Sequence, residues 1–127
     1  SLLIIRRRYA QADAELTRAL ATSRDRRTSY LAHLFAGRAS ARLGRFEAAA
    51  THIDAALALF PDAQSALLAR SQLALQRADV TGALSPVDRL AHVNHDRPPV
   101  DPWLTYDAGP GRDASTLLAD LWASMRR

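Results

Sequence analysis

The amino-acid sequence predicts an all-α protein built from antiparallel helical hairpins. The first observation is composition, because about one residue in five is alanine, the strongest helix former and small enough for close helix packing. The second is the segment 30–61, in which apolar residues recur at three- and four-residue steps on both sides of Gly44, as in amphipathic helices. The third observation is that this spacing recurs elsewhere in the chain.

Gly44 marks the turn between two helices within 30–61. Glycine adopts backbone conformations that other residues avoid, and it often follows the end of a helix. Pro61 lacks a backbone N–H and ends the second helix. The small or apolar positions are Leu31, Leu34, Phe35, Ala39 and Leu43 in the first run and Phe46, Ala49, Ala50, Ile53, Ala56, Leu57 and Phe60 in the second. The segment therefore predicts one helical hairpin.

The apolar spacing of the second helix occurs three times. Its copies are Tyr9, Ala12, Leu16, Ala19 and Leu20; then Phe46, Ala49, Ile53, Ala56 and Leu57; then Val80, Ala83, Val87, Leu90 and Ala91. The step from the first copy to the second is slightly longer than the step from the second to the third, which places extra residues in the connection near 23–28. The third copy is degenerate, with Ala78 in the position of the turn glycine.

The middle copy resembles a tetratricopeptide repeat. The matching residues are Ala36, Gly37, Gly44, Phe46, Ala49, Ile53, Ala56, Leu57 and Pro61. The usual length of such a repeat is about 34 residues, and the step from Phe46 to Val80 has this length. The family's tryptophan is missing, since His33 stands there. The resemblance implies a short right-handed α-solenoid, and the chain looks like the C-terminal fragment of a bacterial protein with such repeats.

On this resemblance, residues 1–97 hold about two and a half repeats: a partial one over 1–27, then 28–62 and 63–97. Residues 98–127 differ in composition and are expected to form a C-terminal capping segment, with Asp101 and Pro102 starting a helix. A final helix would cover the open end of the stack. Its apolar face consists of Leu117, Leu118, Leu121, Trp122 and Met125.

Polar residues predict where the other helices begin. One helix is expected over 2–22, and Thr28 or Ser29 is the expected cap of the next. Asp62 is the expected cap of a helix from 63 to about 77. The following helix begins either at Asp79 or near Ser85, because a proline follows Ser85 and prolines suit the first turn of a helix.

Charge and composition bear on partners and location. All 17 basic side chains are arginine, the net charge is +4, and there is no cysteine. The arginines are scattered rather than gathered on one face, so nucleic acid is not an expected partner. No apolar run approaches the ~20 residues that span a membrane. The chain is expected to be soluble, in a bacterial cytoplasm or periplasm, and the sequence leaves the compartment open.

No residue pattern predicts catalysis or a cofactor. His92 and His95 have a spacing that metal ligands can use, but no further ligand accompanies them, so they are interpreted as surface histidines. His33 and His52 are isolated in the sequence, and the acidic residues fall at predicted caps or on polar helix faces. The chain is therefore not expected to be an enzyme.

The resemblance implies a binding role instead. In tetratricopeptide stacks the first helices of the repeats line a concave groove that holds a partner's peptide or helix. The corresponding residues here are Leu31, Leu34, Phe35, Arg38, Arg42, Ser65, Leu68, Gln72, Leu75 and Gln76. Arg38 and Arg42 are one helical turn apart and suit a carboxylate or phosphate. Where the chaperone-binding subfamily carries its lysine and asparagines, this chain has Leu34 and Arg38 in the middle repeat and Leu68 and Gln72 in the last, so a chaperone tail is not expected.

The predicted function is thus a non-catalytic scaffold that binds a protein or peptide partner. Two alternatives remain: a helical appendage or oligomerisation region of a larger bacterial enzyme, or part of a transcription regulator with Arg6–Arg8 near its DNA-binding portion. A homodimer through the Trp103–Trp122 region is a further hypothesis, because exposed aromatic residues can form an interface.

Overall fold

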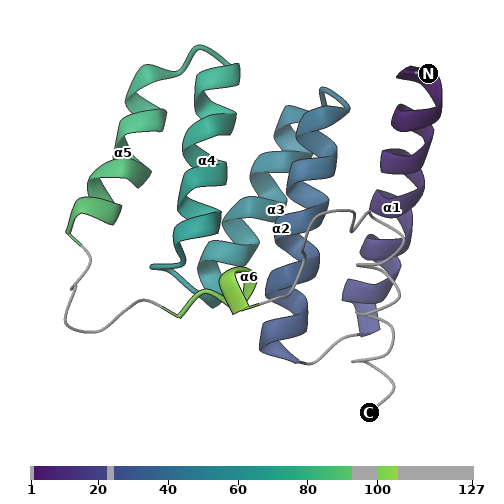
Figure 1. Ribbon diagram of the computed structural model, residues 1–127, viewed down its shortest axis with the longest axis horizontal. Helices are drawn as coiled ribbons and strands as arrows, with labels where there is room; N and C mark the ends of the chain where they lie inside the picture. Colours follow the sequence, from purple (N-terminus) through teal and green to yellow (C-terminus); the bar gives the residue numbers. More distant parts are fainter. Residues whose placement is uncertain (1, 23–24, 93–99, 106–127) are drawn as a thin grey trace.

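The computed structural model describes residues 2–22, 25–92 and 100–105 (Figure 1). These residues form helices and no strand, which confirms the all-α class. The helices are α1 (Leu2–Thr22), α2 (Arg26–Arg42), α3 (Phe46–Leu59), α4 (Gln64–Gln76), α5 (Val80–Ala91) and the short α6 (Pro102–Thr105). The final helix expected around Leu117–Met125 lies outside the described residues.

Helices α1 to α5 alternate in direction, and α2 and α3 overlap in the view of Figure 1. The closest neighbours are α2 with α3 and α4 with α5, while α1 packs on α2 and α3 packs on α4. Helix α2 also touches α4 and α6. The hairpin expected within 30–61 is present, since α2 ends at Arg42 and α3 begins at Phe46.

Two of the predicted helix caps are wrong. Helix α2 is capped by Asp25, whose carboxylate accepts a hydrogen bond from the Thr28 backbone N–H at 3.2 Å. Helix α4 has Ala63 in the cap position, and this residue makes no side-chain cap hydrogen bond. The Asp62 carboxylate is instead paired with Arg89 of α5 at 2.9 Å. An ion pair with α5 has thus replaced the local cap.

Helix α5 begins at Val80 rather than near Ser85. The Asp79 carboxylate accepts a hydrogen bond from the Gly82 backbone N–H at 3.0 Å and so caps the helix. Pro86 therefore lies inside α5, past the first turn that prolines favour. The cap and the packing of α5 on α4 stabilise the helix by more than the missing backbone N–H of Pro86 costs.

The turns that follow α2 and α4 have the same backbone geometry. After α2 the Arg45 N–H donates a hydrogen bond to the Ser40 carbonyl, and after α4 the Asp79 N–H donates to the Ala74 carbonyl, both at 2.8 Å. Such a bond satisfies a carbonyl that the helix end would leave unpaired. The sequence repeat is therefore accompanied by a repeated local structure.

Ala78→Gly is expected to raise the free energy of unfolding by about 0.5–1 kcal/mol. Ala78 has φ 57°, close to the 77° of Gly44 at the equivalent turn, and this left-handed conformation strains any residue with a Cβ atom. Urea unfolding followed by circular dichroism measures the change. The control Ala48→Gly, on the exposed surface of helix α3, should lower stability by about the same amount. A loss of stability in Ala78→Gly would contradict the argument.

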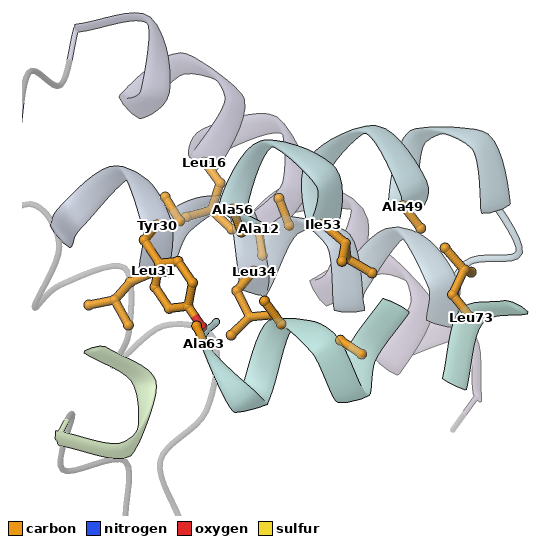
Figure 2. Packing of buried hydrophobic residues seen from close by; sticks show 14 residues of the cluster. Ala12, Leu16, Tyr30, Leu31, Leu34, Ala49, Ile53, Ala56, Ala63 and Leu73 are labelled. Atoms are coloured by element: carbon orange, nitrogen blue, oxygen red, sulfur yellow. The ribbon is translucent and has the colours of Figure 1, made fainter. Parts of the chain in front are cut away.

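The buried core runs through α1, α2, α3 and α4. Leu16 of α1, Leu34 of α2, Ile53 of α3 and Leu73 of α4 are at most 1% exposed, and they belong to one cluster (Figure 2). Alanines fill much of the remaining space, so the helix backbones lie close together. This core holds α2 and α4 next to each other, which positions the candidate site.

Candidate functional site

The ten residues expected in the groove fall into two groups in the structure. Six are exposed: Arg38, Arg42, Leu68, Gln72, Leu75 and Gln76. The side chains of Leu31, Leu34 and Ser65 are buried, and Phe35 is partly buried against the core. A buried side chain offers no surface to a partner, so only the exposed six form an accessible face of α2 and α4. The binding role of all ten stays a prediction.

A short segment of the chain is seated at one end of this face. Helix α6 lies against α2 and beside the start of α4 (Figure 1). Asp101, the residue before α6, is only 4% exposed. One oxygen of its carboxylate accepts a hydrogen bond from the Tyr30 hydroxyl, and the other accepts one from the Ser65 backbone N–H, each at 2.8 Å. The carboxylate thus joins α2, α4 and α6.

The position of Asp101 follows from the missing cap of α4. Ser65 is the second residue of α4, and the alanine at the cap position cannot accept a hydrogen bond from its N–H. Asp101 supplies the acceptor from 36 residues away. The positive end of the α4 dipole favours a negative charge there. A carboxylate from a distant segment has therefore taken the role that the sequence assigned to Asp62.

Tyr30 supplies the second donor from the core. It is 0% exposed, and its ring packs edge-on against Phe60 with centroids 5.1 Å apart. Burial, and then the hydrogen bond to Asp101, raise the pKa of the Tyr30 hydroxyl far above its usual value. The hydroxyl therefore stays protonated at neutral pH and donates to the carboxylate.

Trp103 of α6 and Arg38 of α2 form a second contact between segment 100–105 and the helices. The Arg38 guanidinium carbon lies 4.9 Å from the centre of the Trp103 ring, within the range of a cation–π interaction. Desolvation lowers the pKa of Arg38, although the residue as a whole remains exposed. The Trp103 backbone N–H also donates to the Asp101 carboxylate at 3.1 Å, as expected for a local helix cap.

Two histidines that are isolated in the sequence meet between α2 and α3. The Nδ1 atoms of His33 and His52 lie 3.1 Å apart. Burial, followed by the nearby His52, lowers the pKa of His33. Two neutral rings can share one hydrogen between these atoms, so that one ring donates and the other accepts. Within the described residues no third histidine, aspartate, glutamate or cysteine joins them in a metal-binding group.

Sequence reasoning missed Tyr30 as a site residue, placed Trp103 only in a hypothetical homodimer interface and assigned Asp101 only a local cap. Tyr30 and Asp101 are separated by 71 residues along the chain, and no motif connects them. One local signal existed: Ala63 stands at the start of α4, where a capping side chain is usual. The His92–His95 spacing and the Trp103–Trp122 region are each described at one residue alone, because His95 and Trp122 lie outside the described residues.

The comparisons with known proteins add no assignment to this geometry. Among the helices that the structure describes, none is both long and apolar enough to cross a membrane. No protein-family model, curated protein or solved structure matches the chain.

Proposed function

We propose that this protein is a non-catalytic interaction scaffold, which binds a peptide or helix of a partner protein along the face formed by α2 and α4. The observation that carries the proposal is the seated segment 100–105. A stretch distant in sequence lies against these two helices, held by side-chain and backbone hydrogen bonds. Such contacts are the kind that recognise a peptide.

The exposed residues beyond that segment support the same proposal. Arg38 and Arg42 of α2 are exposed, and so are Leu68 and Leu75 of α4, which are 38% and 59% exposed. Exposed leucines on α4 and exposed arginines on α2 suit a segment that is amphipathic and acidic. The repeated turns after α2 and α4 support a tetratricopeptide-like stack, in which the first helices of the repeats form the binding groove.

The test is an affinity capture with matched variants. The chain would be immobilised and exposed to a bacterial lysate, beside Leu68→Glu/Leu75→Glu and the control Ala48→Glu/Ala58→Glu, which adds the same charges on the exposed side of α3. Circular dichroism would first establish equal helicity. We expect a protein that is retained by the wild type and the control and lost from the α4 variant.

Other outcomes would contradict the proposal. Equal capture by all three baits would place the contact away from α4, and capture of nothing by any bait would remove the support for a scaffold. Leu68 lies one helical turn beyond Ser65, which holds Asp101, whereas Leu75 lies ten residues beyond Ser65 on α4. The single variant Leu75→Glu therefore tests the far part of the face separately from the contact at Asp101.

A further inference from the structure

The seat at the end of the α2–α4 face consists of the Tyr30 hydroxyl, the Ser65 backbone N–H and the Arg38 guanidinium. We call these three groups the Asp101 seat: the first two hold the Asp101 carboxylate, and the guanidinium contacts the Trp103 ring. We propose that the seat recognises an aspartate followed two residues later by an aromatic residue in a partner protein. We further propose that the chain's own segment 100–105 occupies the seat until such a partner displaces it. This inference rests on the proposed function.

The seat is specific for a carboxylate. Its two hydrogen-bond donors approach different oxygens of Asp101, each at 2.8 Å. An asparagine in the same place would turn an N–H group towards one of the two donors and lose that hydrogen bond. Hydrogen bonds to an ionised acceptor are also stronger than those to a neutral one. Because Tyr30 is 0% exposed, its hydroxyl cannot exchange the lost partner for bulk water.

The seat also sets the spacing of the aromatic residue. Trp103 follows Asp101 by two positions and reaches the Arg38 guanidinium, 4.9 Å from its ring centre. The Trp103 backbone N–H returns to the Asp101 carboxylate at 3.1 Å, so carboxylate and ring come from one compact turn. This third hydrogen bond lies within the segment itself. A partner segment with the same spacing would form the equivalent hydrogen bond within itself.

The segment 100–105 can be displaced because its short helix packs mainly on α2. Helix α6 contacts α2 but makes no extended contact with α3, α4 or α5 among the described residues. Val100, just before Asp101, is 69% exposed. The seated segment contributes the buried Asp101 carboxylate, the buried Pro102 and the Trp103 ring, which packs against the core cluster while remaining partly exposed. An incoming segment would replace the same contacts.

The choice of another protein as the partner follows from charge. The chain carries a net charge of +4, and Arg42 stands exposed one turn beyond Arg38 on α2. This surface attracts an acidic segment and disfavours a second copy of this basic chain. The occupant is thus assigned to a partner protein, and exchange of segment 100–105 between two copies is an outcome that the test distinguishes.

The test uses the hexapeptide Val-Asp-Pro-Trp-Leu-Thr, the sequence of residues 100–105, labelled with a fluorophore. Its binding is measured by fluorescence anisotropy on the wild-type chain and on Asp101→Ala/Trp103→Ala, which vacates the seat. We expect affinity for the vacated chain to be at least about tenfold higher, because in the wild type the covalently linked segment competes at a high effective concentration. A peptide with asparagine for aspartate should bind at least about tenfold more weakly.

Other results would overturn the inference. Equal binding of the aspartate and asparagine peptides would show that the seat does not select a carboxylate. A vacated chain that keeps its helicity but binds no peptide would show that the seat takes no ligand. Dimers of the wild type that the peptide dissociates would make a second copy the occupant, and the assignment to another protein would be wrong.

A second variant keeps the test decisive if the double substitution unfolds the chain. Asp101→Asn preserves the size of the side chain and weakens only its hydrogen bonds. The labelled aspartate peptide should bind this variant more tightly than the wild type, and equal affinities would contradict self-occupancy. If capture on the α4 surface succeeds while the peptide assay fails, the scaffold function stands and the inference about the seat falls.

Discussion

Leu34→Ala is expected to lower the free energy of unfolding by about 2–5 kcal/mol. Leu34 is 0% exposed and belongs to the cluster that joins α2, α3 and α4 (Figure 2). Truncation would remove apolar contacts and leave a cavity that close-packed helices cannot fill completely. Urea unfolding followed by circular dichroism measures the loss.

The control for this change is Leu68→Ala, in the equivalent position of the next hairpin. Leu68 is 38% exposed, so its truncation should lower stability by about 1 kcal/mol or less. The sequence repeat places both leucines in the groove, whereas the structure places Leu34 in the core. Similar losses in the two variants would mean that Leu34 is as accessible as Leu68 and would contradict the described packing.

Gly37→Val is expected to lower the free energy of unfolding by about 1–3 kcal/mol. A Cβ atom added to Gly37 would lie 2.7 Å from Cγ1 of Ile53 and 3.2 Å from the backbone oxygen of Ala49. Ile53 is 1% exposed and cannot swing away, so α2 and α3 must separate. Valine has a better helix propensity than glycine, which offsets only about a few tenths of a kcal/mol of this loss. Chemical denaturation measures the net change.

A second-site variant checks this cause. Ile53→Ala removes the atom that the new side chain would meet, so the double variant should be more stable than the sum of the two single losses predicts. Simple additivity would show that the cost of Gly37→Val does not come from this contact. The equivalent position in the next hairpin is Ser71, whose hydroxyl donates to the Ala83 carbonyl at 2.8 Å. Gly37 and Ser71 are thus both small residues, each at a point where its helix meets the second helix of its hairpin.

Most of the helices were predictable because their signals are local. Gly44 and its apolar neighbours encode a helix, a turn and a second helix within a few residues of one another. The beginnings of helices were less predictable. Asp25 rather than Thr28 caps α2, and Asp62 pairs with Arg89 of α5 instead of capping α4. Several polar residues stand near each helix start, and the packing of neighbouring helices decides which one remains to cap it.

The candidate site was predictable only in outline. Repeat spacing grouped residues on α2 and α4, but it could not separate the buried Leu34 from the exposed Leu75. A pattern defines the face of a helix, whereas exposure depends on what covers that face. Asp101 was outside the predicted groove for the same reason, since its partners come from α2 and α4 through tertiary contact.

Local sequence was enough to predict the all-helical class, the hairpin around Gly44 and the recurrence of its spacing at Val80, because helix periodicity and turn chemistry act between near neighbours. The burial of the Asp101 carboxylate between Tyr30 and Ser65 came only with the packed helices. That arrangement depends on an unsatisfied N–H at the start of α4 and a buried hydroxyl on α2. The two donors meet one acceptor only after the helices have packed.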